Sequence, residues 1–184
     1  MRTCLSIIFL LLWSVVFPQI RLKLERSTIA FKSEAPLETI QAATHAATGL
    51  LDVNARTFAV QIPVTSFEGF NAPLQREHFN ENYMVSRTWP NATFSGRIIE
   101  AVDLSKPGTY EVRAKGLLNL RGEARERIIP CHVVVHPLGV EVTTNFEIVV
   151  EDHGIRIPRV VQQKIAATVA VRVDLQFQNG EAHR

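Results

Sequence analysis

The chain has 184 residues, which is enough for one domain with a substantial core and too few for two. Hydrophobic residues make up 46% and charged residues 21%, so neither a disordered chain nor a membrane protein with many spans is expected. The formal net charge is +2, and the basic residues are scattered among acidic ones, so no nucleic-acid partner is expected.

An apolar segment opens the chain, because residues 5–17 are hydrophobic except for two serines. This run is shorter than the roughly 20 apolar residues that a spanning helix needs. We therefore expect a signal peptide over residues 1–19 and a mature domain over residues 20–184 that is periplasmic or secreted. The residues just before Pro18 are larger than those that a signal peptidase prefers, so an uncleaved N-terminus close to a membrane is the alternative.

Cysteine usage provides no disulfide framework for the exported domain. Cys4 lies in the predicted signal peptide, which leaves Cys131 alone in the mature chain. We expect Cys131 to be a small buried hydrophobe in a strand, and a large core to hold the fold together.

Alternation of apolar and polar residues dominates the rest of the chain and predicts strands that are buried on one face. In residues 165–177 every odd-numbered position is apolar, whereas the even positions include Arg172 and Asp174. Similar or shorter patterns occur at residues 29–31, 40–46, 58–64, 94–98, 110–120, 128–135 and 140–148. About eight strands suit an up-and-down barrel, which closes on itself and so has no free edge.

Turn residues separate these segments and predict short, antiparallel connections. Residues 106–108, 121–123 and 136–139 each contain Gly, with Pro in two of them, where the chain must reverse. Only residues 73–84 and one turn starting at Pro158 have a helical pattern. The predicted fold is therefore all-β: a single antiparallel barrel of about eight strands with one or two short helices.

No motif of a known catalytic site occurs in the sequence, which lacks a phosphate-binding loop, a nucleophile elbow, a Cys-x-x-Cys pair and a His-Glu-x-x-His motif. The histidines lack the short spacings of metal ligands and are expected to be surface or capping residues. Asp152 and His153 are explained by a turn before Gly154 more simply than by an acid–base pair. We therefore expect no enzyme, no catalytic residue, no metal and no cofactor.

Small residues on the inward faces leave two interpretations open. Either they line a lumen that holds a ligand, or they make room for the helix at residues 73–84 and for aromatic side chains. The residues concerned are Ala42, Thr44, Ala46, Ala114, Gly116 and Ala167.

A series of blocks in one order resembles the YceI-like family over residues 24–177. The blocks are STIAF at residues 27–31, EHFNENYM at 77–84, WPNATFSG at 89–96, PGTY at 107–110, GLLNLRG at 116–122 and DHGIRIP at 152–158. The resemblance implies a lipocalin-like barrel, usually periplasmic, that encloses a polyisoprenoid or a similar long-chain lipid such as a quinone. It implies no enzymatic activity.

The expected function is therefore a lipid carrier or a stress-related reservoir, with a non-enzymatic envelope interaction protein that has a filled core as the alternative. An apolar lipid is the expected partner, and a homodimer is left open. Inward parity assigns the ligand site to Phe31, Ile40, Ala42, Phe58, Val60, Phe94, Ala114, Leu118, Val142, Phe146, Ile165 and Val169 on the strands, and to Phe79, Tyr83 and Met84 on the helix.

The charged residues give only a weak candidate for a lipid head group. Arg121, Arg125 and Arg127 lie near one hairpin and could meet a phosphate, but a solvated turn is the preferred interpretation.

Overall fold

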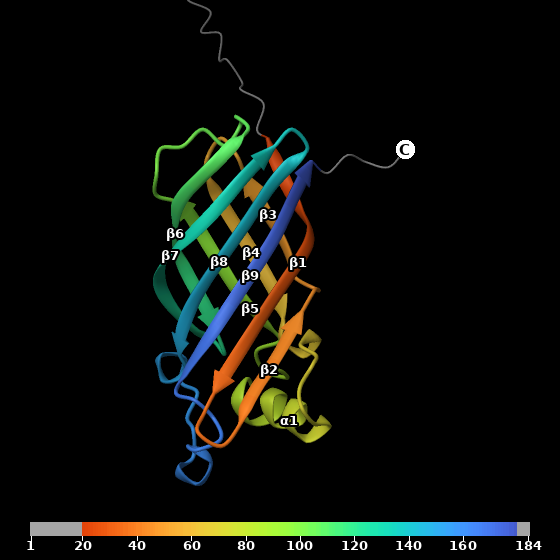
Figure 1. Cartoon of the computed structure of the whole chain (residues 1–184), viewed down its shortest axis with the longest axis vertical. Coiled ribbons are helices and arrows are strands. Elements are labelled where there is room, and N and C mark those ends of the chain that lie inside the picture. Colours follow the sequence, from red (N-terminus) through yellow and green to blue (C-terminus); the bar gives the residue numbers. More distant parts are fainter. Residues whose placement is uncertain (1–19, 180–184) are drawn as a thin grey trace, which may run out of the picture.

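Long, curved strands account for most of the computed structural model, which describes residues 20–179 (Figure 1). They are β1 (Arg21–Glu34), β2 (Thr39–Thr44), β3 (Thr48–Asp52), β4 (Thr57–Pro63), β5 (Asn91–Ile98), β6 (Gly108–Leu120), β7 (Glu123–His136), β8 (Gly139–Val149) and β9 (Thr168–Asn179). The ring closes because β9 pairs with β1, and all pairings are antiparallel. With β2 set aside, eight strands form the ring, so the predicted barrel is confirmed.

The first strand has two successive partners on one side. The start of β1 pairs with β3 and its end pairs with β2, while β9 runs along its other side. β2 therefore lies beside the ring of eight strands, as an extension of the wall next to the end of β1.

The single strand predicted at residues 40–46 is wrong for its last two residues, because the chain leaves the ladder after Thr44. The Thr44 hydroxyl accepts a hydrogen bond from the Ala46 amide at 3.1 Å, and His45 Nδ1 donates to the Ser27 carbonyl at 2.9 Å. Such local side-chain bonds compete with strand pairing. Ala46 is consequently exposed, and a separate strand, β3, follows.

The helical elements lie in the two longest connections. The helix predicted at residues 73–84 is present as α1 (Pro73–His78) and a π-helical turn, η2 (Phe79–Tyr83), with Pro73 in the first turn. Single 3₁₀ turns are η1 (Val64–Ser66), η3 (Val150–His153) and η4 (Arg159–Val161). Within residues 20–179, no helix is both long and apolar enough to cross a membrane. The predicted signal peptide lies outside the described residues.

The two ends of the barrel carry different connections (Figure 1). At the upper end, where β1 begins and β9 ends, the strands are joined by short turns and by residues 99–107. At the lower end lie α1 and the connection formed by residues 150–167. The site described below opens among these lower connections.

Two of the small residues expected to widen the lumen have other roles. Gly116 is paired with Gly96, and a Cβ atom on Gly116 would lie 2.3 Å from the Ser95 carbonyl oxygen. Gly116 therefore allows β5 and β6 to approach closely, and does not serve to enlarge the lumen. Ala167 is exposed, because β9 begins only after it.

Candidate functional site

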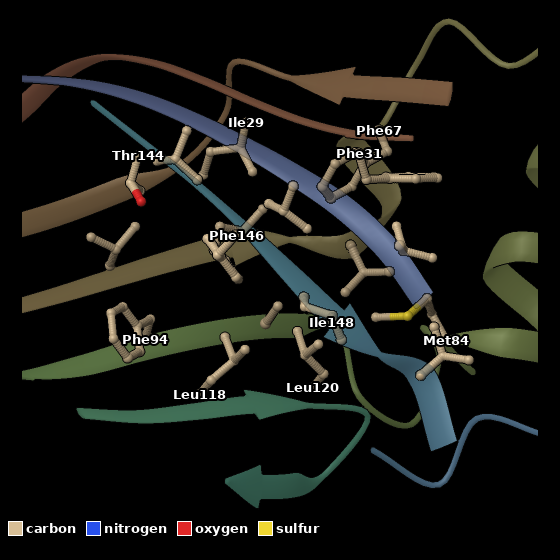
Figure 2. Close-up of a pocket in the computed structure, with 18 of the residues that line it drawn as sticks. Ile29, Phe31, Phe67, Met84, Phe94, Leu118, Leu120, Thr144, Phe146 and Ile148 are labelled. Atoms are coloured by element: carbon tan, nitrogen blue, oxygen red, sulfur yellow. The ribbon is translucent and has the colours of Figure 1, made fainter. Parts of the chain in front are cut away.

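An apolar cavity of about 630 Å³ runs through the inside of the barrel, within the range of small-molecule sites. Every strand of the closed ring contributes to its wall, because alternate residues of each strand point inward. Figure 2 shows side chains from facing strands, among them Ile29, Phe94, Leu118 and Phe146, pointing into this space. Of the two open interpretations, the structure therefore supports a lumen, although Ala114 is the one member of the six small residues that lines it.

The predicted ligand-binding residues lie on the wall of this cavity, with one exception. Their contact with a ligand stays a prediction. The residues on the wall are Phe31, Ile40, Phe58, Val60, Phe79, Tyr83, Met84, Phe94, Ala114, Leu118, Val142, Phe146, Ile165 and Val169.

Ala42 is the exception. It is buried, but it lines a second hollow together with Lys32 and Arg172. Because β2 lies beside the ring, its inward parity brings Ile40 to the cavity wall but leaves Ala42 outside the lumen.

The aromatic residues Phe67 and Phe70 also line the cavity and were not predicted, since they lie in a connection without any periodic pattern. Phe31 stacks on Phe79 with ring centroids 5.4 Å apart, and Phe67 and Phe70 pack against both rings. The cluster joins the end of β1 to the helical turn η2 and so fixes one side of the lower end.

Two polar side chains on the cavity wall, Thr144 on β8 and Ser33 near the end of β1, already have partners. The Thr144 hydroxyl donates to the Pro130 carbonyl at 2.6 Å, and the Ser33 hydroxyl accepts from the Ala166 amide at 2.9 Å. Cys131 is buried, as predicted, and desolvation raises the pKa of its thiol, which makes it a weak nucleophile. The interior therefore suits a ligand portion without polar atoms.

Within residues 20–179, the exposed residues of the cavity lining lie at the lower end, so we take this end as the opening. There the lining includes the exposed residues Leu74, His78 and Lys164, next to the hydrogen-bonded pair Gln75 and Glu38. At the upper end the lining residues Leu104 and Phe177 are buried. A bound molecule would thus have its polar part at the lower end.

The three arginines considered for a head group bind backbone carbonyls instead. Arg121 Nη1 donates to Gly154 O at 2.6 Å, Arg125 Nε to Asp152 O at 2.7 Å and Arg127 Nη2 to Glu147 O at 2.5 Å. The bonds of Arg121 and Arg125 fasten the β6–β7 hairpin to the start of the 150–167 connection, and the bond of Arg127 fastens β7 to the end of β8. The three arginines therefore form neither a phosphate site nor a merely solvated turn.

His153 is fully buried, so the prediction of a surface or capping histidine is wrong for this residue. Its Nδ1 donates to the Glu123 carbonyl at 3.1 Å, and its Nε2 has no hydrogen-bond partner within residues 20–179. Desolvation lowers the pKa of His153, and the charges of Arg125 and Arg127 act in the same direction. The side chain therefore packs as a neutral imidazole in the wall of the lower end.

Groups of three or more histidine, cysteine, aspartate or glutamate side chains that could hold a metal ion do not occur within the described range. The fold and the cavity define a closed β-barrel protein with an apolar interior space. The chain belongs to the YceI-like family, because the model of the YceI-like domain matches residues 21–177. No curated protein matches it.

Several solved structures share the fold at low sequence identity. A polyisoprenoid binding domain from Saccharophagus degradans superposes with a TM-score of 0.73 at 15% identity, covering 88% of this chain and 99% of that one. BcnA of Burkholderia cenocepacia gives 0.67 at 18% identity, covering 82% and 95%. The YceI protein of Campylobacter jejuni gives 0.57 at 8% identity, covering 96% and 94%.

Proposed function

We propose that the protein is an exported, non-enzymatic binding protein that holds one long apolar lipid, of the polyisoprenoid or quinone type, in the barrel cavity. The observation that carries this proposal is the apolar cavity of about 630 Å³, on whose wall the hydroxyls of Thr144 and Ser33 are already hydrogen-bonded within the protein. A hydrocarbon chain gives up no hydrogen bonds when it enters such a space, whereas a polar molecule would leave its own hydrogen bonds to water unreplaced.

The binding energy would come from the length of the buried chain. Each methylene removed from water contributes about 0.8 kcal/mol, so a chain of about ten methylenes gains about 8 kcal/mol. Part of this gain is offset by the lost conformational freedom of the bound chain. Because the gain comes from buried apolar area, specificity would depend on the length and shape of the lipid more than on hydrogen bonds. The exposed polar residues His78 and Lys164 would be near the lipid head group.

Export is part of the proposal. It is supported by the short apolar run at residues 5–17, which has the length of a signal peptide and not of a spanning helix. On this view residues 20–184 act in the periplasm or outside the cell as a carrier or reservoir.

The ligand class is supported by the structural neighbour from Saccharophagus degradans, which is described as polyisoprenoid binding.

A binding titration on delipidated protein tests the proposal. N-phenyl-1-naphthylamine is bound first, and geranylgeraniol is then added to displace it. We expect displacement by geranylgeraniol and none by glycerol, because only the former supplies an apolar chain. Absence of naphthylamine binding, or equal displacement by both alcohols, would contradict the proposal.

Two alanine variants provide matched controls for that titration. Ala114→Phe puts a ring into the cavity, since Ala114 is buried on its wall, and we expect it to abolish binding of both naphthylamine and geranylgeraniol. Ala59→Phe adds the same ring on the exposed face of β4 and is expected to bind like the wild type. Equal behaviour of the two variants would mean that the probe binds elsewhere.

A further inference from the structure

Three segments surround the opening of the cavity and are hydrogen-bonded to one another. The Leu37 amide in the turn between β1 and β2 donates to the Gln163 carbonyl at 2.8 Å. Gln75 on α1 donates through its side-chain amide to the Glu38 carboxylate in the same turn. The turn, α1 and the 150–167 connection therefore form one rim at the lower end (Figure 1).

Each of these segments carries one exposed apolar side chain. Leu37 is 66% exposed, Leu74 is 57% exposed and Val160 is 91% exposed. A single exposed apolar residue is ordinary, and Leu138, 80% exposed in a turn at the upper end, is an example. Three of them on one rim, around the mouth of an apolar cavity, mark an interaction surface. We call Leu37, Leu74 and Val160, with the basic residues named next, the rim face.

The basic residues of the rim face lie in a stretch without acidic ones. Arg156, Arg159 and Lys164 are exposed, and residues 154–167 contain no aspartate or glutamate. None of these three side chains forms an ion pair within the described residues 20–179. On the barrel wall, Arg113 and Lys115 pair with carboxylates at 2.7 and 3.2 Å, while Lys23 and Arg97 form no ion pair within residues 20–179.

An exposed aliphatic side chain flanked by unpaired cations suits one kind of partner. At the surface of an anionic bilayer the apolar group inserts among the acyl chains while the cations stay with the phosphates. We propose that the rim face docks on an anionic lipid bilayer, with the opening of the cavity turned toward the lipid. The described chain ends do not obstruct this contact, because β1 begins and β9 ends at the opposite end (Figure 1).

This docking goes beyond the proposed function and does not require it. Only its purpose, the exchange of a lipid between bilayer and cavity, rests on the proposed function. The rim face itself would bind vesicles whether the cavity is empty or filled.

Co-sedimentation with vesicles tests the proposal. The probes are vesicles of phosphatidylcholine alone and vesicles that contain phosphatidylglycerol as well. We expect the protein to sediment with the anionic vesicles at low salt and to be released as salt increases, since exposed charges are screened. Absence of binding to anionic vesicles, or equal binding to neutral ones, would overturn the proposal.

Variants of residues that do not line the cavity locate the contact. Arg156→Gln combined with Arg159→Gln is expected to weaken binding about 25-fold, at about fivefold for each basic residue at an anionic surface. Val160→Ser should weaken it further when added to that pair. The matched controls are Lys23→Gln with Arg97→Gln, which remove two exposed charges from the wall, and Leu138→Ser at the upper end.

The outcomes separate this proposal from its alternatives. If the wall variants weaken binding as much as the rim variants, the attraction is a property of the whole surface and the proposal fails. If size-exclusion chromatography finds a dimer that the rim variants convert to a monomer, a second copy covers the rim face, and the proposal fails as well. Protein that binds geranylgeraniol but never sediments with anionic vesicles would keep the proposed function and lose the docking.

Discussion

The two ends of the barrel differ in whether a connection covers the interior with an apolar side chain. At the upper end, Leu104 from the 99–107 connection is 2% exposed and covers the interior, whereas at the lower end Leu37 and Val160 project from the rim. Nearly all of the cavity lining between them is apolar. Buried Leu104 contributes to the stability of the fold. The exposed side chains of Leu37 and Val160 contribute little to stability and are available for contact with a partner. Variants at the upper end therefore test the stability of this barrel, and variants at the lower end test its contacts.

Removal of the upper closure should have the largest effect. Leu104→Ala is expected to lower the free energy of unfolding by about 3 kcal/mol, because a buried leucine is replaced by space. Leu37→Ala, at the lower end, is expected to change it by less than about 0.5 kcal/mol. Urea denaturation of both variants measures the difference. Similar losses for the two would mean that the ends are not distinct.

Loss of one arginine that fastens the rim should have a smaller and more local effect. Arg125→Ala removes the hydrogen bond to Asp152 O and is expected to cost about 1 kcal/mol, since the guanidinium is partly exposed to water. Hydrogen exchange should accelerate in residues 150–167 and not in the β5–β6 pair. Arg113→Ala, which breaks a wall ion pair, serves as the control. Uniform acceleration across the barrel would show that the rim does not open on its own.

Acid should weaken the lower end through His153. Its pKa is lowered in the folded state, so the unfolded chain takes up a proton first as the pH falls below the ordinary histidine value of about 6.5. Stability is therefore complete above that pH and is lost as the pH falls toward the lowered pKa. His153→Gln should flatten the dependence of unfolding free energy on pH between about 7 and 5. An unaltered slope in His153→Gln would mean that the imidazole does not stay neutral.

Changes in the exposed apolar residues should have the smallest effect on folding. Val160→Ser and Leu138→Ser are each expected to shift the midpoint of thermal unfolding by no more than the uncertainty of the measurement, because both side chains already contact water. Differential scanning calorimetry checks this. A clear destabilisation by Val160→Ser would contradict this expectation and indicate that the Val160 side chain is packed against the protein.

The barrel could be predicted from the sequence where one face of a strand is buried along its whole length. The alternation of Val169, Val171, Val173, Leu175 and Phe177 on β9 is a direct result of that burial, and all five line the cavity. Strand β3 was missed because its neighbouring leucines, Leu50 and Leu51, hide the alternation, although only Leu51 is buried.

The lower end could not be predicted in the same way. His153 is buried by contact with Glu123, and Arg121 is engaged by Gly154, about thirty positions away along the chain. Such contacts depend on how two connections meet in space and leave no periodic signal in the sequence. The same holds for Phe67 and Phe70, which reach the cavity from a connection.

Native mass spectrometry of the protein purified without detergent from a bacterial envelope tests the central claim most directly. We expect one long-chain lipid per protein chain, identified as an isoprenoid or quinone after extraction into chloroform and methanol, and its loss in Ala114→Phe. A protein that repeatedly carries no lipid, although Ala59→Phe and the wild type are fully folded, would contradict the account and leave the barrel as a scaffold for interactions at its outer surface.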